Sequence, residues 1–372
     1  MPHYLWQTPE WTHFLWDAEA LLRPLSAVRK RQGRFLRAME ELGFEDGLRA
    51  YAMIVEEDAI QTAAIEGEKL DREGVRSSIA IHLGLPTAGL RPADRVIDGL
   101  VAVLLDATHN HENKLTKELL CGWHSALFPT GRSGFHSIVT GAWRDAPMQV
   151  VSGALGKQKV HFEAPPPERM ENEMDAFFAW WEDSREKLDG IIRAALAHLY
   201  FVTIHPFDDG NGRLARTITD MALAQDEGTG KRYYSLSAQI MKERDTYYAM
   251  LEKVQSGDNG CTEWLLWFTG CFERALVEAE SVLTAIMFKA VFWKHHAENV
   301  VNERQIKVLN RLLDMGKGGF DGGLSTRKYM GMTKTSRATA WREIDDLLQK
   351  KMLRPLPGGG RSTAYEIEWN MD

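Results

Sequence analysis

Long hydrophobic runs and cysteines are both scarce in this 372-residue sequence. No segment approaches the roughly 20 uncharged apolar residues that a membrane-spanning helix needs, so we expect no membrane partner. The first eleven residues, MPHYLWQTPEW, have neither the basic nor the apolar segment of a signal peptide, and we expect a cytoplasmic protein. The only cysteines are Cys121, Cys261 and Cys271, and their spacing fits neither a disulfide framework nor a structural zinc site. We expect them to be small buried apolar residues.

The sequence also contains no repeat of fixed period and no low-complexity tract. Apolar residues make up 44% and charged residues 26%, which is the balance of a soluble globular protein. A chain of 372 residues is too long for one ordinary core, so we expect two or three domains.

The net charge of −7 is unevenly distributed along the chain. Residues 301–372 contain 13 Lys and Arg against 9 Asp and Glu, a balance of +4, which leaves −11 for the other 300 residues. This asymmetry sets the C-terminal segment apart and is a weak indication of an anionic partner for it.

Helical spacing dominates the chain to about residue 290. Apolar positions recur at steps of three and four within residues 10–66 and again from 170 to 183. Residues 190–204 are almost uncharged, which predicts a helix buried on most sides. The glycine and prolines of TAGLRPAD, at 87–94, predict a turn between two helical blocks. We therefore predict a mainly α protein, with loop-like structure over residues 122–145.

A short β-hairpin is predicted to interrupt the helices at residues 148–162. Two runs of β-prone residues flank a turn that contains Gly153 and Gly156. The prolines of APPPE, at 164–168, cannot donate to a β-ladder and end the hairpin. One role of such a hairpin is purely structural, which is to cover the edge of a core.

The stretch HPFDDGNGRLAR combines charge with backbone flexibility directly after the apolar helix. Gly210, Asn211 and Gly212 offer consecutive backbone N–H groups in conformations that few other residues adopt easily. Because LARTITDMALAQ continues as a helix, these groups lie at a helix N-terminus, where phosphate oxygens bind. Arg213 and Arg216 are three residues apart on one helical face and can bind further phosphate oxygens.

The acidic residues of the same stretch would repel a phosphate unless a cation lies between them. Mg²⁺ takes one or two carboxylates together with substrate oxygens, and Asp209, which adjoins the glycines, is the predicted ligand. Asp208 is either a further ligand or a solvated loop residue. His205 follows the buried helix and has a pKa near neutrality, so it can take a proton from an attacking hydroxyl. Pro206 and Phe207 are predicted to fix the loop.

HPFDDGNGRLAR resembles the signature of the Fic family, HPFx[D/E]GN[G/K]RxxR, with every defined position filled. Proteins of this family mostly transfer AMP from ATP to a Ser, Thr or Tyr hydroxyl of a target protein. The resemblance implies that His205 is the general base, that Asp209 binds Mg²⁺, and that the backbone of residues 210–212 forms an anion hole. It also implies phosphate contacts from Arg213 and Arg216.

Flanking segments extend the resemblance over roughly residues 50–285. HLYFVTIHPF leads into the motif, and RDTYYAMLEKVQSGD, at 244–258, follows it. In Fic proteins a hairpin before the motif acts as a flap that holds the target segment by strand pairing, and the hairpin at 148–162 has the matching position. The target is either another protein or the chain itself, and the sequence leaves a homodimer open.

A second motif lies in EEDAIQTAAIEGEKL, residues 56–70. Thr62 and Glu66 share one helical face with small residues, and Gly67 is placed to end the helix. By its position alone, Glu66 is either a surface residue or the partner of a buried cation. TAAIEG resembles the inhibitory motif of the Fic family, [S/T]xxxE[G/N], whose glutamate pairs with the second arginine of the signature, here Arg216. The resemblance implies that Glu66 keeps Arg216 from binding the γ-phosphate of ATP.

Residues 301–372 are predicted to form a winged-helix-like domain. Ile306, Leu309, Leu312 and Leu313 occupy one helical face, a helix–turn–helix pattern follows, and extended stretches around GGG close the chain. TSRATAWREIDDLLQK occupies the position of a recognition helix. The groups suited to phosphates and base edges are Lys334, Thr335, Ser336, Arg337, Thr339, Arg342 and, on the wing, Arg361. The partner of this domain is either DNA or protein.

The sequence therefore predicts three regions: a helical region with the inhibitory motif (1–110), a Fic catalytic core (111–290) and a winged-helix-like domain (295–372). The predicted function is that of an autoinhibited protein adenylyltransferase, and removal of AMP from targets is left open. One alternative is a DNA-binding transcription regulator whose core only senses nucleotide. Another is a Fic enzyme that transfers phosphate or phosphocholine.

Overall fold

The computed structural model describes residues 4–41, 43–87, 89–152, 159–316, 320–357 and 363–370. The protein is mainly helical, which confirms the predicted fold class. The chain divides into two compact units, Met1–Glu41 with Leu48–Ala279, and Leu42–Gly47 with Glu280–Asp372.

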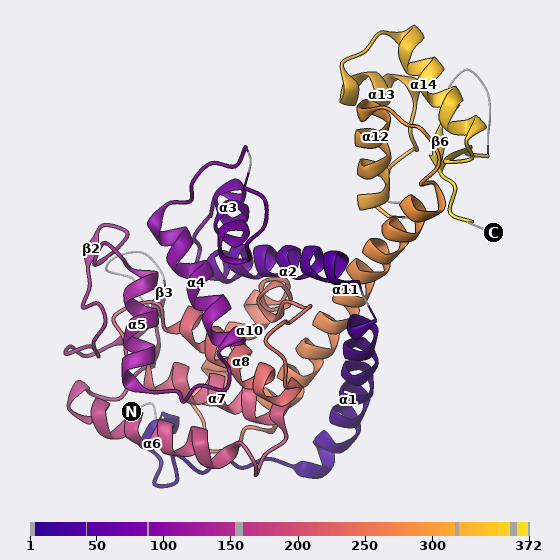
Figure 1. Ribbon diagram of the computed structural model, residues 1–372. Coiled ribbons are helices and arrows are strands. Elements are labelled where there is room, and N and C mark those ends of the chain that lie inside the picture. The colour runs from indigo at the N-terminus through magenta and orange to yellow at the C-terminus, as the bar shows by residue number, and fades with distance from the viewer. Residues whose placement is uncertain are drawn as a thin grey trace. The chain divides into compact units, whose positions relative to one another are not determined.

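Helices account for most of the chain up to residue 295 (Figure 1). Their bounds are α1 (Ala18–Glu40), α2 (Phe44–Ile65), α3 (Arg72–His82), α4 (Arg95–His109), α5 (Lys117–Leu127), α6 (Met170–Ser184), α7 (Gly190–Ile204), α8 (Asn211–Glu227), α9 (Leu236–Lys242), α10 (Arg244–Gln255) and α11 (Thr262–His295). Short 3₁₀ helices lie at Leu5–Gln7 and Pro167–Arg169. Side chains that accept backbone N–H groups begin several of the helices, namely Asp17, Asp71, Asp94, Thr116 and Asp189.

Helices α7 and α8 lie in the middle of the first unit (Figure 1). Every residue of α7 from Ile191 to Ile204 is buried, as its nearly uncharged sequence predicts. α8 is buried without interruption from Arg213 to Ala224 and packs along α7. Since both helices are buried, the link between them, residues 205–210, is fixed at each end.

The hairpin predicted at residues 148–162 is confirmed. It consists of β3 (Gln149–Ser152) and β4 (Lys159–Glu163), which pair antiparallel with a shift in register between Val150 and Val151. Phe162 of β4 is buried and its ring packs edge-on against Tyr4 at a centroid distance of 5.2 Å. The turn glycines predicted for this hairpin, Gly153 and Gly156, lie outside the described residues.

A second hairpin lies where the sequence predicts only loop. β1 (Arg132–Ser133) and β2 (His136–Ser137) pair antiparallel around a left-handed Gly134, whose φ is 53°. Strands of two residues are too short to show an alternating apolar pattern, so they could not be predicted from the sequence. In the folded chain this hairpin lies next to the stretch that follows α7, because Ser133 contacts Asp209.

The second unit has its own core. α12 (Glu303–Asp314), α13 (Thr326–Thr333) and α14 (Arg337–Gln349) are followed by β5 (Leu353–Pro355) and β6 (Tyr365–Ile367), which pair antiparallel. Leu309, Leu312 and Leu313 are buried as predicted, but Ile306 is 37% exposed, because Val308 takes the inward position on α12. The winged-helix assignment stays a prediction, and Arg361 lies outside the described residues.

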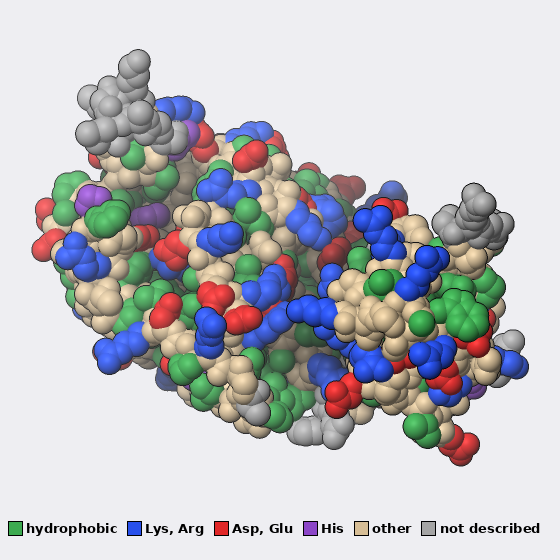
Figure 2. Space-filling view, turned by 90° about the horizontal axis from the view of Figure 1, so that it is seen from above, with side chains coloured by type: hydrophobic (Ala, Val, Ile, Leu, Met, Phe, Trp, Pro, Cys, Tyr) green, Lys and Arg blue, Asp and Glu red, His purple; other side chains and the backbone are tan. Residues whose placement is uncertain are grey.

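Cys261 and Cys271 are buried and Cys121 is half-buried, and all three are free thiols. None of the helices in the described part of the chain is long and apolar enough to cross a membrane. On the face drawn in Figure 2, basic and acidic side chains are interspersed over the surface.

Candidate active site

His205 ends α7 in a left-handed backbone conformation, with φ 53° and ψ 59°. Its backbone N–H donates to the Phe201 carbonyl oxygen at 2.9 Å. The ring Nδ1 lies 3.1 Å from the Val202 carbonyl oxygen, and because a carbonyl can only accept, Nδ1 carries the hydrogen. Nε2 therefore keeps its lone pair and is able to accept a proton.

Arg144 holds the turn at His205. Its side chain is 2% exposed and donates from Nε to the His205 carbonyl oxygen at 2.8 Å. Nη1 and Nη2 donate to the carbonyl oxygens of Ala146 and Pro165 at 2.8 and 2.5 Å. The backbone N–H of Arg144 also donates to the Pro206 carbonyl oxygen at 2.9 Å. A non-glycine residue in the left-handed region costs about 1–2 kcal/mol, and these bonds offset that cost.

The two aspartates of the motif have different environments. Asp208 Oδ2 accepts the backbone N–H of Val139 at 2.8 Å, so this side chain anchors the loop and is not simply solvated. Asp209 Oδ1 accepts the Gly210 N–H at 2.6 Å, and Oδ2 accepts the hydroxyl of Ser133. Each carboxylate oxygen of Asp209 still has a lone pair, which is the donor that Mg²⁺ takes in proteins.

Gly210 and Asn211 begin α8. Gly210 has φ 79°, and a Cβ there would lie 2.8 Å from a ring carbon of Phe128, so glycine is required on both grounds. The buried side chain of Asn211 accepts the Phe207 N–H at 3.0 Å and donates to the Phe207 carbonyl oxygen at 2.7 Å. The sequence predicts a role only for the backbone of Asn211, whereas its side chain closes the loop.

Arg213 and Arg216 are buried on one face of α8, at 3% and 2% exposure. Among the described residues, Arg213 Nε and Arg216 Nη1 have no hydrogen-bond partner. Buried N–H groups without partners are rare in folded proteins and often mark the place of a ligand. Together with the N-terminus of α8, the two guanidinium groups fit a phosphate chain.

A carboxylate of the chain itself lies against Arg216 and the start of α8. Glu66 Oε1 accepts Arg216 Nη2 at 2.7 Å. Thr62 accepts the Arg216 Nε through its hydroxyl at 2.7 Å and Nη2 through its carbonyl at 3.0 Å. A Cβ on Gly212 would lie 2.2 Å from the same Glu66 oxygen, so the carboxylate lies directly against the start of α8. The structure thus contains the Glu66–Arg216 contact, and its inhibitory effect stays a prediction.

The turn after α2 brings a second carboxylate to α8. Gly67 has φ 83°, and the N–H groups of Gly67 and Glu68 donate to the carbonyl oxygens of Ala64 and Ala63, both at 3.0 Å. This Schellman turn is the helix end that the sequence predicts at Gly67. It places Glu68 Oε2 3.1 Å from Nη1 of Arg213, so each motif arginine meets one carboxylate of this turn.

Helix α10 holds the last carbonyl of α2. The Arg244 Nε donates to the Ile65 carbonyl oxygen at 2.7 Å, and the Tyr248 hydroxyl donates to the same oxygen at 3.3 Å. The guanidinium of Arg244 also lies 5.0 Å from the ring centroid of Tyr248. These contacts fix the residue directly before Glu66.

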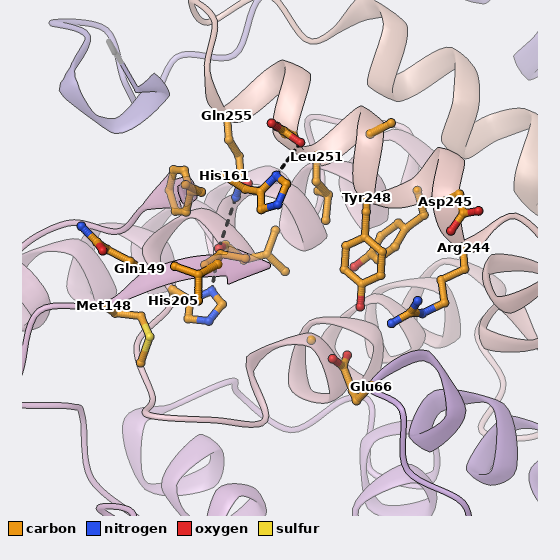
Figure 3. A pocket seen from close by; sticks show the side chains of 18 residues that line it. Glu66, Met148, Gln149, His161, His205, Arg244, Asp245, Tyr248, Leu251 and Gln255 are labelled. Atoms are coloured by element: carbon orange, nitrogen blue, oxygen red, sulfur yellow. Dashed lines mark hydrogen bonds and ion pairs between the residues drawn. The ribbon is translucent and has the colours of Figure 1, made fainter. Parts of the chain in front are cut away.

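A cavity of about 690 Å³ opens between these groups and the β3–β4 hairpin. Figure 3 shows the imidazole of His205 and the carboxylate of Glu66 at the same cavity, with Arg244 and Tyr248 beside Glu66. Gln149 of β3 lines it from the side of the hairpin. A cavity of this size holds a ligand as large as a nucleotide.

Burial lowers the pKa of His205 below its ordinary value of 6.5. The hydrogen bond to Val202 and the carboxylates of Glu66 and Asp209 oppose this shift in part. The ring is therefore neutral at neutral pH, which is the form that a general base requires.

The residues of segment 124–144 that support this site could not be predicted from the sequence. His124, Ser133 and Arg144 all lie in the stretch predicted as loop, and none belongs to a motif of fixed spacing. The one available hint was the mixture of glycine with polar and charged residues in this stretch.

Residues 114–223 match the model of the Fic/DOC family. The chain contains a Fic domain. The matched region includes both the motif that begins at His205 and the supporting segment 124–144 of the Fic domain. Residues 4–85, which include Glu66, match a second model, described as a domain of unknown function (DUF4172).

Curated relatives resemble parts of the chain. A uridine 5'-monophosphate transferase of Xanthomonas campestris pv. campestris is 46% identical over 65 residues, which are 16% of this chain and 12% of that protein. A protein adenylyltransferase Fic of Nematostella vectensis is 34% identical over 113 residues, 30% of this chain and 25% of that protein. The fic-1 protein adenylyltransferase of Caenorhabditis elegans is 29% identical over 201 residues, 53% and 36% of the two chains. The chain thus spans only an eighth to about a third of the length of these relatives.

Solved structures share the fold at low sequence identity. A Fic family protein from Desulfovibrio desulfuricans G20 has a TM-score of 0.56 and 19% identity, and the match covers 94% of this chain and 96% of that one. A Fic domain containing signaling protein from Bacteroides thetaiotaomicron has a TM-score of 0.53 and 19% identity, over 70% and 94% of the two chains. These likenesses concern the fold alone.

Proposed function

We propose that this chain is a protein adenylyltransferase, which transfers AMP from ATP to a Ser, Thr or Tyr hydroxyl of a target protein. The observation that carries this proposal is a neutral His205 imidazole at a cavity that Glu66 and Gly212 also line, together with two buried arginines next to that cavity wall. Arg216 contacts Glu66, Arg213 contacts Glu68, and each arginine keeps a nitrogen without a hydrogen-bond partner among the described residues. The imidazole supplies a base, and the arginines supply a place for a polyphosphate.

The reaction is an in-line displacement at the α-phosphorus. The target hydroxyl oxygen attacks phosphorus, the bond from phosphorus to the bridging oxygen breaks, and pyrophosphate leaves. Nε2 of His205 takes the hydroxyl proton. Arg213, Arg216 and the first turn of α8 bind the phosphate oxygens and stabilise their developing charge. Asp209 would hold Mg²⁺, which neutralises charge on the triphosphate when bound.

Autoinhibition by Glu66 is part of this proposal. Its carboxylate bonds Arg216 Nη2 and lies against Gly212, so it takes up contacts that phosphate oxygens need. A carboxylate and a phosphate cannot share this position because both are anionic and both need the same donors. Removal of AMP from modified targets, assisted by Glu66, is a further activity proposed for the same site.

The β3–β4 hairpin is the proposed docking place for the target. Val150, Val151 and Val160 are at least 36% exposed on these two strands, although they are apolar. Strand addition at such an edge binds an extended peptide through main-chain hydrogen bonds. It would bring a hydroxyl of the peptide into the cavity at His205.

The decisive experiment uses the Glu66→Gly variant of the full chain with Mg²⁺ and ATP, weighed as intact protein by mass spectrometry. We expect a gain of one AMP per modified site, a much slower gain in the unaltered protein, and none in Glu66→Gly combined with His205→Ala. A parallel incubation with UTP tests the donor, since one relative is named as a uridine 5'-monophosphate transferase. Gain of UMP alone, gain of phosphate alone, or no gain at all would each contradict the proposal.

The second unit favours an additional function in DNA binding. Lys334, Arg337 and Arg342 are exposed at the turn and start of α14, and no carboxylate of the described residues lies within 4 Å of them. By contrast, Arg304 and Lys350 of the same unit each pair with a carboxylate. Exposed cations without carboxylate partners are available to bind phosphate oxygens.

Replacement of these three cations by glutamine in the full chain tests this function. We expect binding to a random-sequence DNA duplex, followed by fluorescence anisotropy, to weaken and its salt slope to fall by about 3, since each phosphate contact contributes roughly 0.9. Trp341, 59% exposed on the same helix, is the feature that favours a protein partner. If the unaltered chain and the glutamine variant bind DNA with equal affinity, or if neither binds DNA, the result favours a protein partner.

A further inference from the structure

Asp209 is held in one orientation by groups from three different segments. Ser133 of the β1–β2 hairpin donates its hydroxyl to Oδ2, and the Gly210 N–H donates to Oδ1 at 2.6 Å. His124 of α5 bonds the backbone carbonyl of the same residue through Nε2 at 3.2 Å. Both the side chain and the peptide of Asp209 are thus held by contacts within the chain.

We propose that Ser133 and His124 are positioning residues that present the Asp209 carboxylate to the divalent cation of the nucleotide. This inference rests on the proposed nucleotide transfer, for which Asp209 is the metal ligand. A carboxylate that must bind a cation at one angle loses affinity when its side chain rotates freely. Residues that hydrogen-bond a metal ligand typically change metal affinity or activity by about 10–100-fold when they are removed.

Ser133 controls the side chain of Asp209. Its hydroxyl has one hydrogen, which goes to Oδ2, while the Gly210 N–H takes Oδ1. With one bond on each oxygen, rotation of the carboxylate is blocked, and one lone pair on each oxygen remains for a cation. Ser133 is placed by the register of its hairpin, in which it pairs with His136.

His124 controls the backbone of Asp209. A carbonyl oxygen only accepts, so Nε2 of His124 carries the hydrogen and Nδ1 is free to accept the Gly141 N–H at 3.0 Å. The ring is fully buried and stacks on Phe207 at a centroid distance of 4.1 Å and an angle of 7°. Both ring nitrogens and the ring face are therefore engaged, and the imidazole acts as a rigid spacer between α5 and the motif loop.

The test compares Ser133→Ala with Ser137→Ala, both made in the Glu66→Gly protein so that the anion site is open. Ser137 is the matched control because it is exposed on the other strand of the same hairpin. Isothermal titration calorimetry measures ATP binding without metal and at increasing Mg²⁺. We expect Ser133→Ala to raise the Mg²⁺ concentration for half-saturation about tenfold, with metal-free ATP affinity unchanged, and Ser137→Ala to change neither.

His124 is tested by a graded pair in the same background. His124→Phe keeps a ring on Phe207 but loses both hydrogen bonds, and His124→Gln keeps one N–H donor for the Asp209 carbonyl. We expect a larger rise of the Mg²⁺ requirement in His124→Phe than in His124→Gln, and the same order in the rate of transfer. A uniform loss of metal-free ATP binding or of thermal stability in both variants would instead indicate a purely structural role.

The outcomes separate this inference from the proposed function. If the Glu66→Gly protein binds Mg²⁺ and ATP normally and Ser133→Ala has the same Mg²⁺ requirement, the positioning role is wrong and the transferase proposal stands. If the Glu66→Gly protein binds no nucleotide in the presence of Mg²⁺, the proposed function fails and this inference fails with it.

Discussion

The two arginines of the motif, Arg213 and Arg216, are each bound to a carboxylate that follows α2. Glu66 contacts Arg216 at 2.7 Å, and Glu68 contacts Arg213 at 3.1 Å. The resemblance to the Fic family implies only the first of these pairs. The second pair arises because the Schellman turn at Gly67 directs Glu68 toward α8, the helix that carries both arginines.

At the residue scale we therefore predict that Glu68→Gln strengthens nucleotide binding. Glu68 is partly exposed, and such pairs are worth about 0.2–1 kcal/mol. In the Glu66→Gly background, ATP binding measured by calorimetry should tighten up to about fivefold. Glu73→Gln, which removes the same charge in α3, is the control and should have little effect. If Glu68→Gln and Glu73→Gln tighten ATP binding equally, the effect comes from net charge and not from the contact between Glu68 and Arg213.

A second prediction at the residue scale concerns pH. The general base must be unprotonated, and burial lowers the pKa of His205 below 6.5. The Glu66 carboxylate raises the pKa of His205, so its removal in Glu66→Gly lowers that pKa further. We expect the rate of AMP transfer by that variant, at saturating ATP and Mg²⁺, to be independent of pH near pH 7. The rate should fall as the pH is lowered, with a midpoint below pH 6.5. A midpoint at or above 6.5 would contradict a buried His205 base.

At the scale of elements, close packing of helices depends on single glycines. α4 approaches α5 at Gly99, where a Cβ would lie 1.9 Å from the Ala126 carbonyl oxygen. Gly122, in α5 itself, has no atom within 4 Å of the position of its missing Cβ. The two glycines therefore have opposite roles although both lie in helices, and the sequence alone does not distinguish them.

This difference predicts opposite effects on stability. Gly99→Ala should lower the free energy of unfolding by about 1–3 kcal/mol, because the backbone of α5 must move away. Gly122→Ala should raise it by roughly 0.5–1 kcal/mol, because alanine loses less conformational entropy in a helix. Urea unfolding of the full chain, followed by circular dichroism, measures both. Destabilisation by both substitutions would contradict the packing described for α4 and α5.

At the scale of the whole molecule, each of the two units has a core of its own. The core of the second unit includes Val308, Leu309, Leu312, Leu313 and Ile344, all nearly inaccessible to solvent. The first unit is built around the buried helices α7 and α8. Separate cores allow separate unfolding, because the loss of packing in one does not by itself remove packing in the other.

We accordingly expect two transitions in differential scanning calorimetry of the full chain. Leu309→Ala should cost about 2–5 kcal/mol and lower the midpoint of one transition by roughly 10 °C or more, since a domain of this size shifts by about 4–8 °C per kcal/mol. Gly99→Ala should lower the other midpoint. A single transition that both substitutions shift equally would show that the units unfold together.

Much of the fold and of the site could be predicted from local patterns. The helix at 190–204, the hairpin at 148–162 and the helix end at Gly67 follow from periodicity and turn chemistry, which act over a few residues. The exposed Ile306 and the short β1–β2 hairpin could not be predicted in this way. Each depends on what packs against it, and that is decided by residues distant in the chain.

The sequence by itself determined the motif of the Fic domain and the helix before it, because a phosphate site, a base and a flexible turn need particular residue types at fixed spacing. Only the tertiary structure decided how the motif is held. Ser133 and His124 lie 76 and 85 residues before Asp209 in the chain, and Glu68 lies 145 residues before Arg213. Contacts over such separations depend on the packing of whole helices, and local sequence carries no record of that packing.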